Sequence, residues 1–107
     1  FVDDHVEALI RLQNSNYNCQ TFNIGGEQVL NNSQIVKVVY EEMRRLGLTG
    51  IPNFDAVIEY VDDRPGHDFR YAVDIEKIKR CTGWTPSVKF VTGIEKTIRW
   101  YVSKGAK

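Results

Sequence analysis

The sequence contains little that would hold a metal, cross a membrane or bind a nucleic acid. Its 107 residues include only two cysteines, Cys19 and Cys81, which are too far apart for a metal-site spacing, indicate no disulfide framework and fit a reducing, cytoplasmic compartment. Its 14 basic and 14 acidic residues leave no net charge to attract nucleic acid or an acidic membrane surface. No apolar run has the length of a membrane-spanning helix. We therefore expect no metal, no nucleic-acid partner and no membrane.

The sequence also lacks the usual signatures of a redox or nucleophilic active site. Gly25-Gly26 follows a strand-like segment, but no helix is expected directly after it, so the pair indicates a turn rather than a dinucleotide-binding loop. No tyrosine is followed four residues later by lysine, and no serine or cysteine stands in the context of an activated nucleophile. We therefore expect neither catalytic nor cofactor-binding residues within this chain.

The length and the hydrophobic fraction of 42% suit a single α/β domain, dominated by helices and with a few short strands. The spacing of apolar residues predicts four helices, at about 3–14, 33–46, 75–81 and 92–102. Alternating or β-branched residues predict strands at 21–24 and 57–61, a strand end at 1–2 and an extended segment at 69–73.

Local signals indicate how the first two helices begin and pack. The first helix has an apolar face that we expect to point inward, formed by Val6, Leu9, Ile10 and Leu12. Asn31 or Asn32 is a suitable N-cap for the second helix, because a side-chain oxygen at that position can accept from the first free backbone N–H groups.

The stretch from Asp63 to Asp68 is the most informative part of the chain. Pro65 fixes its own φ and Gly66 can adopt a positive φ, so the pair predicts a tight turn. Arg64 offers a planar set of donors that suits phosphate or carboxylate oxygens. The loop therefore indicates a site for an anionic small molecule. The alternative is a solvated turn with a local Arg–Asp pair.

Several other residues have both a structural and a ligand-binding interpretation. Asn32 can cap a helix, or it can meet a polar ligand where spare backbone donors lie. His67 lies in the Asp63–Asp68 loop, close to Arg64, and can face a ligand. His5, in the first turn of a helix, is interpreted as structural. Trp84, Trp100 and Tyr101 are interpreted as packing residues.

Four segments resemble, in order and spacing, the C-terminal part of dTDP-glucose 4,6-dehydratases, which belong to the extended short-chain dehydrogenase/reductase superfamily. They are residues 1–5 (Phe-Val-Asp-Asp-His), 21–26 (Thr-Phe-Asn-Ile-Gly-Gly), 63–68 (Asp-Arg-Pro-Gly-His-Asp) with 70–72, and 83–86 (Gly-Trp-Thr-Pro) with 93–101. The first two segments are common in the superfamily, whereas the Arg-Pro-Gly-His-Asp stretch is more specific. The resemblance covers nearly the whole chain.

The resemblance implies a Rossmann-type lyase that binds NAD in an N-terminal domain and a nucleotide sugar between that domain and a C-terminal lobe. In this family NAD oxidises the sugar at C4, water is lost across C5–C6, and hydride returns to C6 to give the 4-keto-6-deoxy sugar. Residues 1–107 would form the C-terminal nucleotide-sugar-binding lobe, with the NAD-binding domain upstream of Phe1. The 107-residue chain alone is expected to have no dehydratase activity.

The resemblance also implies which residues meet the substrate. The positions that match the nucleotide-diphosphate part of the site are Asn32, Asp63, Arg64, Pro65, Gly66 and His67. Arg64 would supply charge-assisted hydrogen bonds to the diphosphate oxygens, and Asn32 can donate and accept at once.

Two other interpretations stay open. One is an enzyme that acts on UDP-sugars, either a UDP-glucose 4,6-dehydratase or a UDP-sugar 4-epimerase, because the contacts that distinguish the base lie largely outside these residues. The other is a non-catalytic nucleotide-sugar-binding or scaffold module. The family implies a homodimer formed through Rossmann-domain helices. An isolated lobe with uncovered apolar faces is expected to self-associate.

Overall fold

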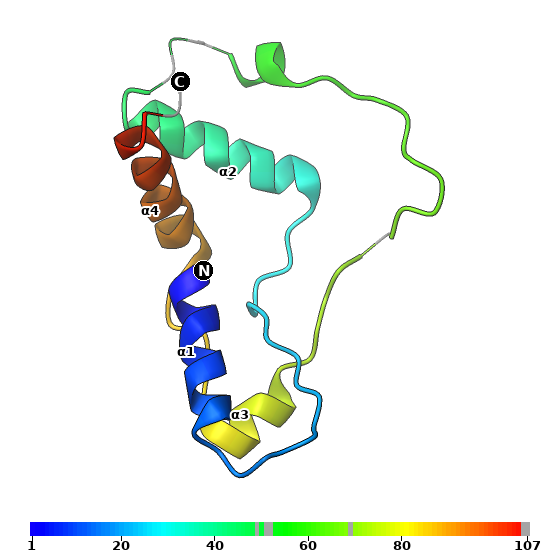
Figure 1. Ribbon diagram of the computed structural model, residues 1–107. Coiled ribbons are helices and arrows are strands. Elements are labelled where there is room, and N and C mark those ends of the chain that lie inside the picture. Colours follow the sequence, from blue (N-terminus) through cyan, green and yellow to red (C-terminus); the bar gives the residue numbers. More distant parts are fainter. Residues whose placement is uncertain (49, 51–52, 69, 106–107) are drawn as a thin grey trace. The chain divides into compact units, whose positions relative to one another are not determined.

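The computed structural model describes residues 1–48, 50, 53–68 and 70–105. The regular elements within these residues are helices, drawn in Figure 1: α1 (Val2–Gln13), α2 (Asn32–Arg45), the 3-10 helix η1 (Phe54–Val57), α3 (Glu76–Thr82) and α4 (Phe90–Ser103). The four predicted helices are confirmed, and their ends lie within two residues of the predicted ones. None of the described helices is both long and apolar enough to cross a membrane.

The predicted strands are wrong. Neither 21–24 nor 57–61 forms a strand, and no strand occurs anywhere in the described part of the chain. α1 begins at Val2, so the strand end predicted at residues 1–2 is helical instead. Residue 69 of the predicted extended segment lies outside the described residues, and 70–73 have no regular structure. A strand is defined by its hydrogen-bond ladder with a neighbour, so an alternating pattern alone does not produce one.

The chain divides into two compact units, and the first comprises residues 1–29 and 71–90. Its core consists of Ala8, Ile75, Ile78 and Trp84, with the partly buried Leu12, Phe22 and Ile24 packed against it. Trp84 is the largest side chain in this core and is 1% exposed. The expectation that Trp84 is a packing residue is therefore confirmed, whereas Trp100 and Tyr101 are 56% and 55% exposed and are not buried as expected.

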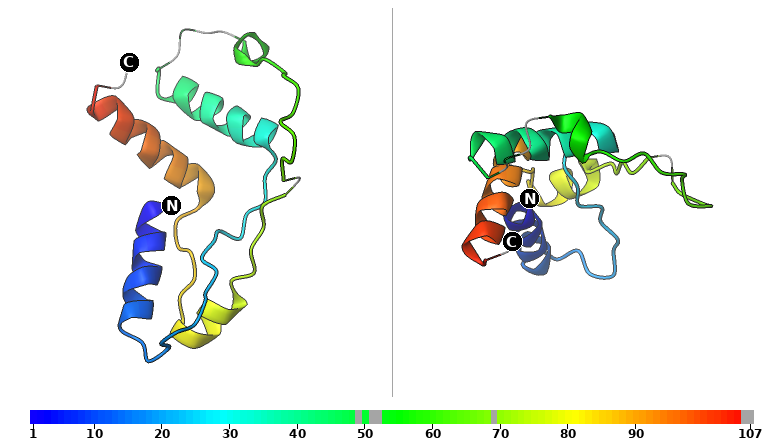
Figure 2. Two further views of the ribbon diagram at one scale, coloured as in Figure 1. Left: turned by 45° about the vertical axis from the view of Figure 1, so that its right-hand side comes forward. Right: turned by 90° about the horizontal axis from the view of Figure 1, so that it is seen from above.

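Within the first unit, the segment before α3 runs beside the extended segment that follows α1 (Figures 1 and 2). The side-chain amide of Asn23 donates to the carbonyl of Asp74 at 3.4 Å. A Cβ placed on Gly25 would lie 2.5 Å from Cγ2 of Val73, so only glycine allows this close approach. The turn predicted at Gly25-Gly26 is not found at these two residues, where a bend follows at Glu27, but the close approach to Val73 gives Gly25 a packing reason.

The face of α1 that packs on this core is not the predicted one. Ala8 is fully buried, and Asp4, one turn earlier, is only 4% exposed. Of the four residues predicted to point inward, Leu12 packs against the core. The other three are 47–50% exposed: Val6, Leu9 and Ile10. A helical pattern shows that a face is apolar, but it does not show which neighbour covers it.

The second unit comprises the described residues of 30–70 and 91–105. The ring of Tyr40 on α2 packs against that of Phe54 in η1, with 5.4 Å between the ring centroids. Arg45 of α2 contacts Glu95 of α4 at 2.7 Å and Glu42 at 2.8 Å. Both partners of the interhelical pair are partly exposed, so we expect it to contribute at most about 1 kcal/mol.

Candidate functional site: the Asp63–Asp68 loop

The predicted tight turn forms at Arg64-Pro65-Gly66-His67. Gly66 has a φ of +73°, the left-handed conformation that glycine adopts without strain. The backbone N–H of His67 donates to the carbonyl of Arg64 at 3.2 Å, which closes the turn. Proline in the second position and a positive-φ glycine in the third are the pattern of a type II turn. The turn places the side chains of its first and last residues close together.

The Nε–H of Arg64 donates to Nδ1 of His67 at 3.1 Å. The same Nδ1 lies 3.8 Å from Oδ1 of Asp63, and that oxygen accepts from the backbone N–H of Arg64 at 2.9 Å. The two contacts of Nδ1 exclude each other, because accepting from Arg64 requires a free lone pair and an ion pair with Asp63 requires a proton. The contact at 3.1 Å has hydrogen-bond geometry and the one at 3.8 Å does not, so Nδ1 accepts from Arg64 in this arrangement.

The loop is open to solvent, and much of the Arg64 guanidinium is unused. Every described residue from 59 to 68 is exposed. Beyond its Nε bond to His67, the Arg64 side chain has no polar partner among the described residues, so its two Nη groups can donate to another molecule. Arg64 is therefore neither buried nor locked in an ion pair with its acidic neighbours. The geometry is compatible with an anion-binding arginine.

Asn31, and not Asn32, caps α2. The side chain of Asn31 accepts from the backbone N–H of Gln34 at 2.8 Å, and the Gln34 side chain accepts from the Asn31 backbone at 2.9 Å. This capping box leaves Asn32 as the first helical residue, with an exposed amide that has no capping role. No contact joins Asn32 to the Asp63–His67 loop within the described residues.

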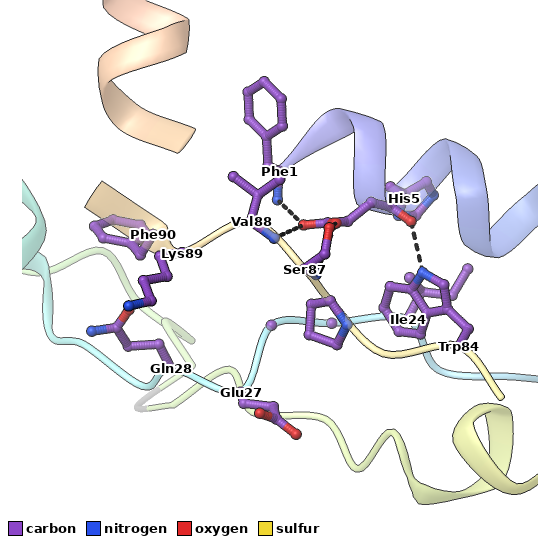
Figure 3. A pocket seen from close by; sticks show the side chains of 14 residues that line it. Phe1, His5, Ile24, Glu27, Gln28, Trp84, Ser87, Val88, Lys89 and Phe90 are labelled. Atoms are coloured by element: carbon purple, nitrogen blue, oxygen red, sulfur yellow. Dashed lines mark hydrogen bonds and ion pairs between the residues drawn. The ribbon is translucent and has the colours of Figure 1, made fainter. Parts of the chain in front are cut away.

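A separate hollow of about 310 Å³ lies in the first unit (Figure 3). Its walls come from the start of α1, residues 24–28 and residues 84–90, and none of the predicted site residues lines it. Its exposed polar lining residues are His5, Glu27, Gln28, Ser87 and Lys89. No group of three or more His, Cys, Asp or Glu side chains that could hold a metal ion occurs in the described part of the chain.

Asp4 lines this hollow and bonds to three other residues of its wall. Its carboxylate accepts from the amide and the hydroxyl of Ser87, at 3.0 and 2.8 Å, and from the amide of Val88 at 3.1 Å. The backbone carbonyl of Asp4 accepts from the indole N–H of Trp84 at 3.1 Å. Burial acts to raise the pKa of Asp4, but these hydrogen bonds outweigh burial and hold the pKa below its usual value. A carboxylate engaged in this way supports the structure and is not free to bind a ligand.

The comparisons with known proteins agree with the resemblance in the sequence. The family model described as GDP-mannose 4,6 dehydratase matches residues 1–97, and the chain belongs to that family. A dTDP-glucose 4,6-dehydratase of Escherichia coli is 43% identical over 106 residues, which are 96% of this chain and 29% of that protein. The dTDP-glucose 4,6-dehydratase of Neisseria gonorrhoeae is 40% identical over 105 residues, 95% of this chain and 30% of that protein.

The resemblance to dTDP-glucose 4,6-dehydratases is therefore confirmed, and the chain spans about 30% of the length of the curated relatives that it matches. A probable dTDP-glucose 4,6-dehydratase of Sinorhizobium fredii is 35% identical over 98% of this chain. The helix-rich structure of the described residues corresponds to a small part of a Rossmann-type enzyme, and the few short strands expected within it are not found.

Proposed function

We propose that the chain is the C-terminal nucleotide-sugar-binding lobe of an NAD-dependent lyase that converts dTDP-glucose to dTDP-4-keto-6-deoxyglucose. The observation that carries this proposal is the shared name of relatives that match the chain along nearly its whole length. Each of them is about three times as long as the matched part, so the complete activity is proposed for a larger gene product that includes this chain.

The substrate contacts that we propose lie in the second unit. The two free Nη groups of Arg64 would donate to the diphosphate oxygens, because a guanidinium binds phosphate through several charge-assisted hydrogen bonds. The turn residues Pro65 and Gly66 and the flanking Asp63 and His67 would line the same part of the site. The support for this role is the exposure of the loop and the unused donors of Arg64.

Asn32 would form a second contact to the nucleotide part of the substrate. Its amide is exposed at the first turn of α2 and is not used for capping. An amide both donates and accepts, which suits the mixed polar groups of a nucleotide. The proposal requires the complete protein to bring Asn32 and the Asp63–His67 loop to one ligand.

The residues of this chain do not fit NAD. The sequence has no glycine-rich dinucleotide-binding loop and no tyrosine followed four residues later by lysine. We therefore assign NAD binding and all redox chemistry to the part of the complete protein that lies outside residues 1–107. Within this chain the proposed role is to bind and orient the nucleotide diphosphate.

The division of the complete protein into an NAD-binding domain and this lobe also accounts for the exposed stripe of α1. Val2, Val6, Leu9 and Ile10 recur at helical spacing and are 47–62% exposed. We propose that the NAD-binding domain covers this stripe in a homodimeric, cytoplasmic enzyme. The two cysteines, both free in this structure, are compatible with that reducing compartment.

The experiment that tests the function is turnover by the complete gene product supplied with NAD. We expect dTDP-glucose to yield the 4-keto-6-deoxy product, detected by NMR, at a higher kcat/KM than UDP-glucose or GDP-mannose. Preferred turnover of UDP-glucose or GDP-mannose would change the substrate but keep the enzyme class. Binding of a nucleotide sugar without any turnover would favour a non-catalytic module.

A further inference from the structure

The turn at residues 64–67 does more than expose Arg64, because it also fixes one edge of the guanidinium. Gly66, with its positive φ, and the 3.2 Å bond from the His67 amide to the Arg64 carbonyl bring the two side chains to the same side of the loop. The Nε–H of Arg64 then donates to Nδ1 of His67 at 3.1 Å. Because the guanidinium is planar, one Nη–H lies parallel to Nε–H on the edge that faces His67, and the other three Nη–H groups point along the remaining edges.

We infer that His67 is a positioning residue: its imidazole holds Arg64 through Nε so that the remaining Nη–H groups are presented to the diphosphate of the substrate. This inference rests on the proposed function, because it assumes that Arg64 binds the diphosphate. An exposed arginine samples many rotamers, and binding would have to restrict them. A preformed bond to His67 restricts these rotamers before the ligand binds, so binding costs less conformational entropy.

The charge state of His67 decides whether this bond can form. A proton on Nδ1 would remove the lone pair that accepts from Arg64, and the new N–H would face Oδ1 of Asp63, which is 3.8 Å away. Asp63 and Arg64 are the charged groups that contact His67 among the described residues, and Asp62 and Asp68 flank the turn in sequence. The bond to Arg64 therefore requires an Nδ1 that carries no proton.

A positioning role and a direct ligand contact predict opposite effects of acid. If His67 only positions Arg64, the affinity for the nucleotide sugar falls as the imidazole becomes protonated. If His67 contacts the diphosphate itself, the extra positive charge raises the affinity. The diphosphate of a nucleotide sugar is esterified at both ends, so it keeps its charge in mild acid. A change of affinity with pH therefore does not come from the charge of the ligand.

The test uses two substitutions of His67 in the complete gene product, with binding of dTDP-glucose measured by calorimetry. His67→Asn keeps an acceptor, because Oδ1 of asparagine occupies the place of Nδ1. His67→Phe keeps a ring of similar size but removes the acceptor. We expect H67F to weaken binding roughly 3- to 10-fold, because one solvent-exposed hydrogen bond is lost, and H67N to stay within about 2-fold of wild type.

Two further measurements separate the possible roles. In an Arg64→Ala background, H67F should have no additional effect, because a residue that acts through Arg64 has nothing left to position. On acidification the wild type should lose affinity while H67N does not, because a protonated Nδ1 cannot accept from Arg64. The loop is exposed, so circular dichroism should show the same fold for every variant.

Each contrary outcome has a definite meaning. If Arg64→Ala leaves affinity unchanged, the proposed function of the loop fails, and this inference fails with it. If Arg64→Ala weakens binding but H67F does not, the function stands and the positioning role is wrong. An equal loss in H67N and H67F, an additive loss in the double variant, or tighter binding in acid would each overturn the inference in favour of a direct contact or a purely structural role.

Discussion

Asp4 and Ser87 are joined by two hydrogen bonds although 83 residues separate them in the sequence. The bonds connect the first turn of α1 to the segment that follows α3, and the indole of Trp84 adds a third link to the same residue. Two of the segments that carry the family resemblance, residues 1–5 and 83–86, therefore meet in the core of the first unit. Their contribution here is structural, whereas the proposed ligand contacts lie in another part of the chain.

The first prediction concerns the buried carboxylate. Asp4→Asn should lower the free energy of unfolding by about 1.5–3 kcal/mol, because an amide cannot accept from all three donors and a charged hydrogen bond is lost. Asp3→Asn is the matched control, since Asp3 is exposed on the same turn of α1. This substitution should lower the free energy of unfolding by less than about 1 kcal/mol. Urea unfolding measures both. Equal effects of the two substitutions would contradict the structural role of Asp4.

The second prediction is a pH dependence of stability that belongs to Asp4. Its folded-state pKa is lower than usual, so the ionised carboxylate stabilises the fold above the ordinary carboxyl pKa. That stabilisation is lost as the pH falls through the lowered folded-state pKa. The difference in unfolding free energy between wild type and Asp4→Asn should therefore shrink from about pH 7 to about pH 3. A difference that stays constant or grows in acid would be inconsistent with the hydrogen bonds described.

The third prediction uses the two tryptophans. Trp84→Phe should destabilise the protein by about 1–3 kcal/mol, because it leaves the Asp4 carbonyl without its indole donor and opens space in the core. Trp100→Phe should change the free energy of unfolding by less than about 0.5 kcal/mol, since Trp100 is 56% exposed. Thermal unfolding of the two variants distinguishes the positions. A smaller loss for Trp84→Phe than for Trp100→Phe would show that the core has been assigned incorrectly.

Most of the helices could be predicted from the sequence because their signals are local. Helical spacing and glycine stops depend on residues within a few positions of one another, as at Gly83, which ends α3 with a φ of +68°. The turn at Pro65-Gly66 was predictable for the same reason. The sequence also left Asn31 and Asn32 as alternative caps, and only the bonds between Asn31 and Gln34 decide between them.

The features that could not be predicted depend on residues far away in the sequence. The alternating pattern at 21–24 indicated a strand, but a ladder needs a second strand, and none occurs among the described residues. Asp4 looked like a first-turn carboxylate, and nothing near it in sequence indicates its bonds to Ser87 and Val88. The bond between Arg64 and His67 lay within reach of a sequence argument, since a tight turn brings its first and last residues together.

The fourth prediction concerns the exposed stripe of α1. The purified 107-residue chain should self-associate in size-exclusion chromatography, because Val6, Leu9 and Ile10 expose apolar surface along one helix. The double substitution Leu9→Lys with Ile10→Lys should reduce that association. Gln13→Lys, an exposed polar position of the same helix, should leave it unchanged. A wild-type chain that stays monomeric at high concentration would count against the idea that the exposed stripe of α1 is a surface for another protein domain.

The fifth prediction is that the 107-residue chain has no dehydratase activity by itself. Its sequence has no dinucleotide-binding loop and no tyrosine–lysine pair at the required spacing. The assay is incubation of the purified chain with dTDP-glucose and NAD, followed by NMR. Formation of a 4-keto-6-deoxy sugar at a rate above that of a buffer control would place redox residues within this chain, contrary to our assignment.

The most direct test of the central claim is the affinity of the complete gene product for dTDP-glucose, with and without the guanidinium of Arg64. We predict that Arg64→Ala weakens binding by roughly 1.5–3 kcal/mol, the range for a lost charged hydrogen bond, and that Arg80→Ala, which removes an exposed arginine of α3, has no effect. Unchanged affinity in Arg64→Ala, or an equal loss in Arg80→Ala, would contradict the account and leave the Asp63–Asp68 loop as a solvated surface turn.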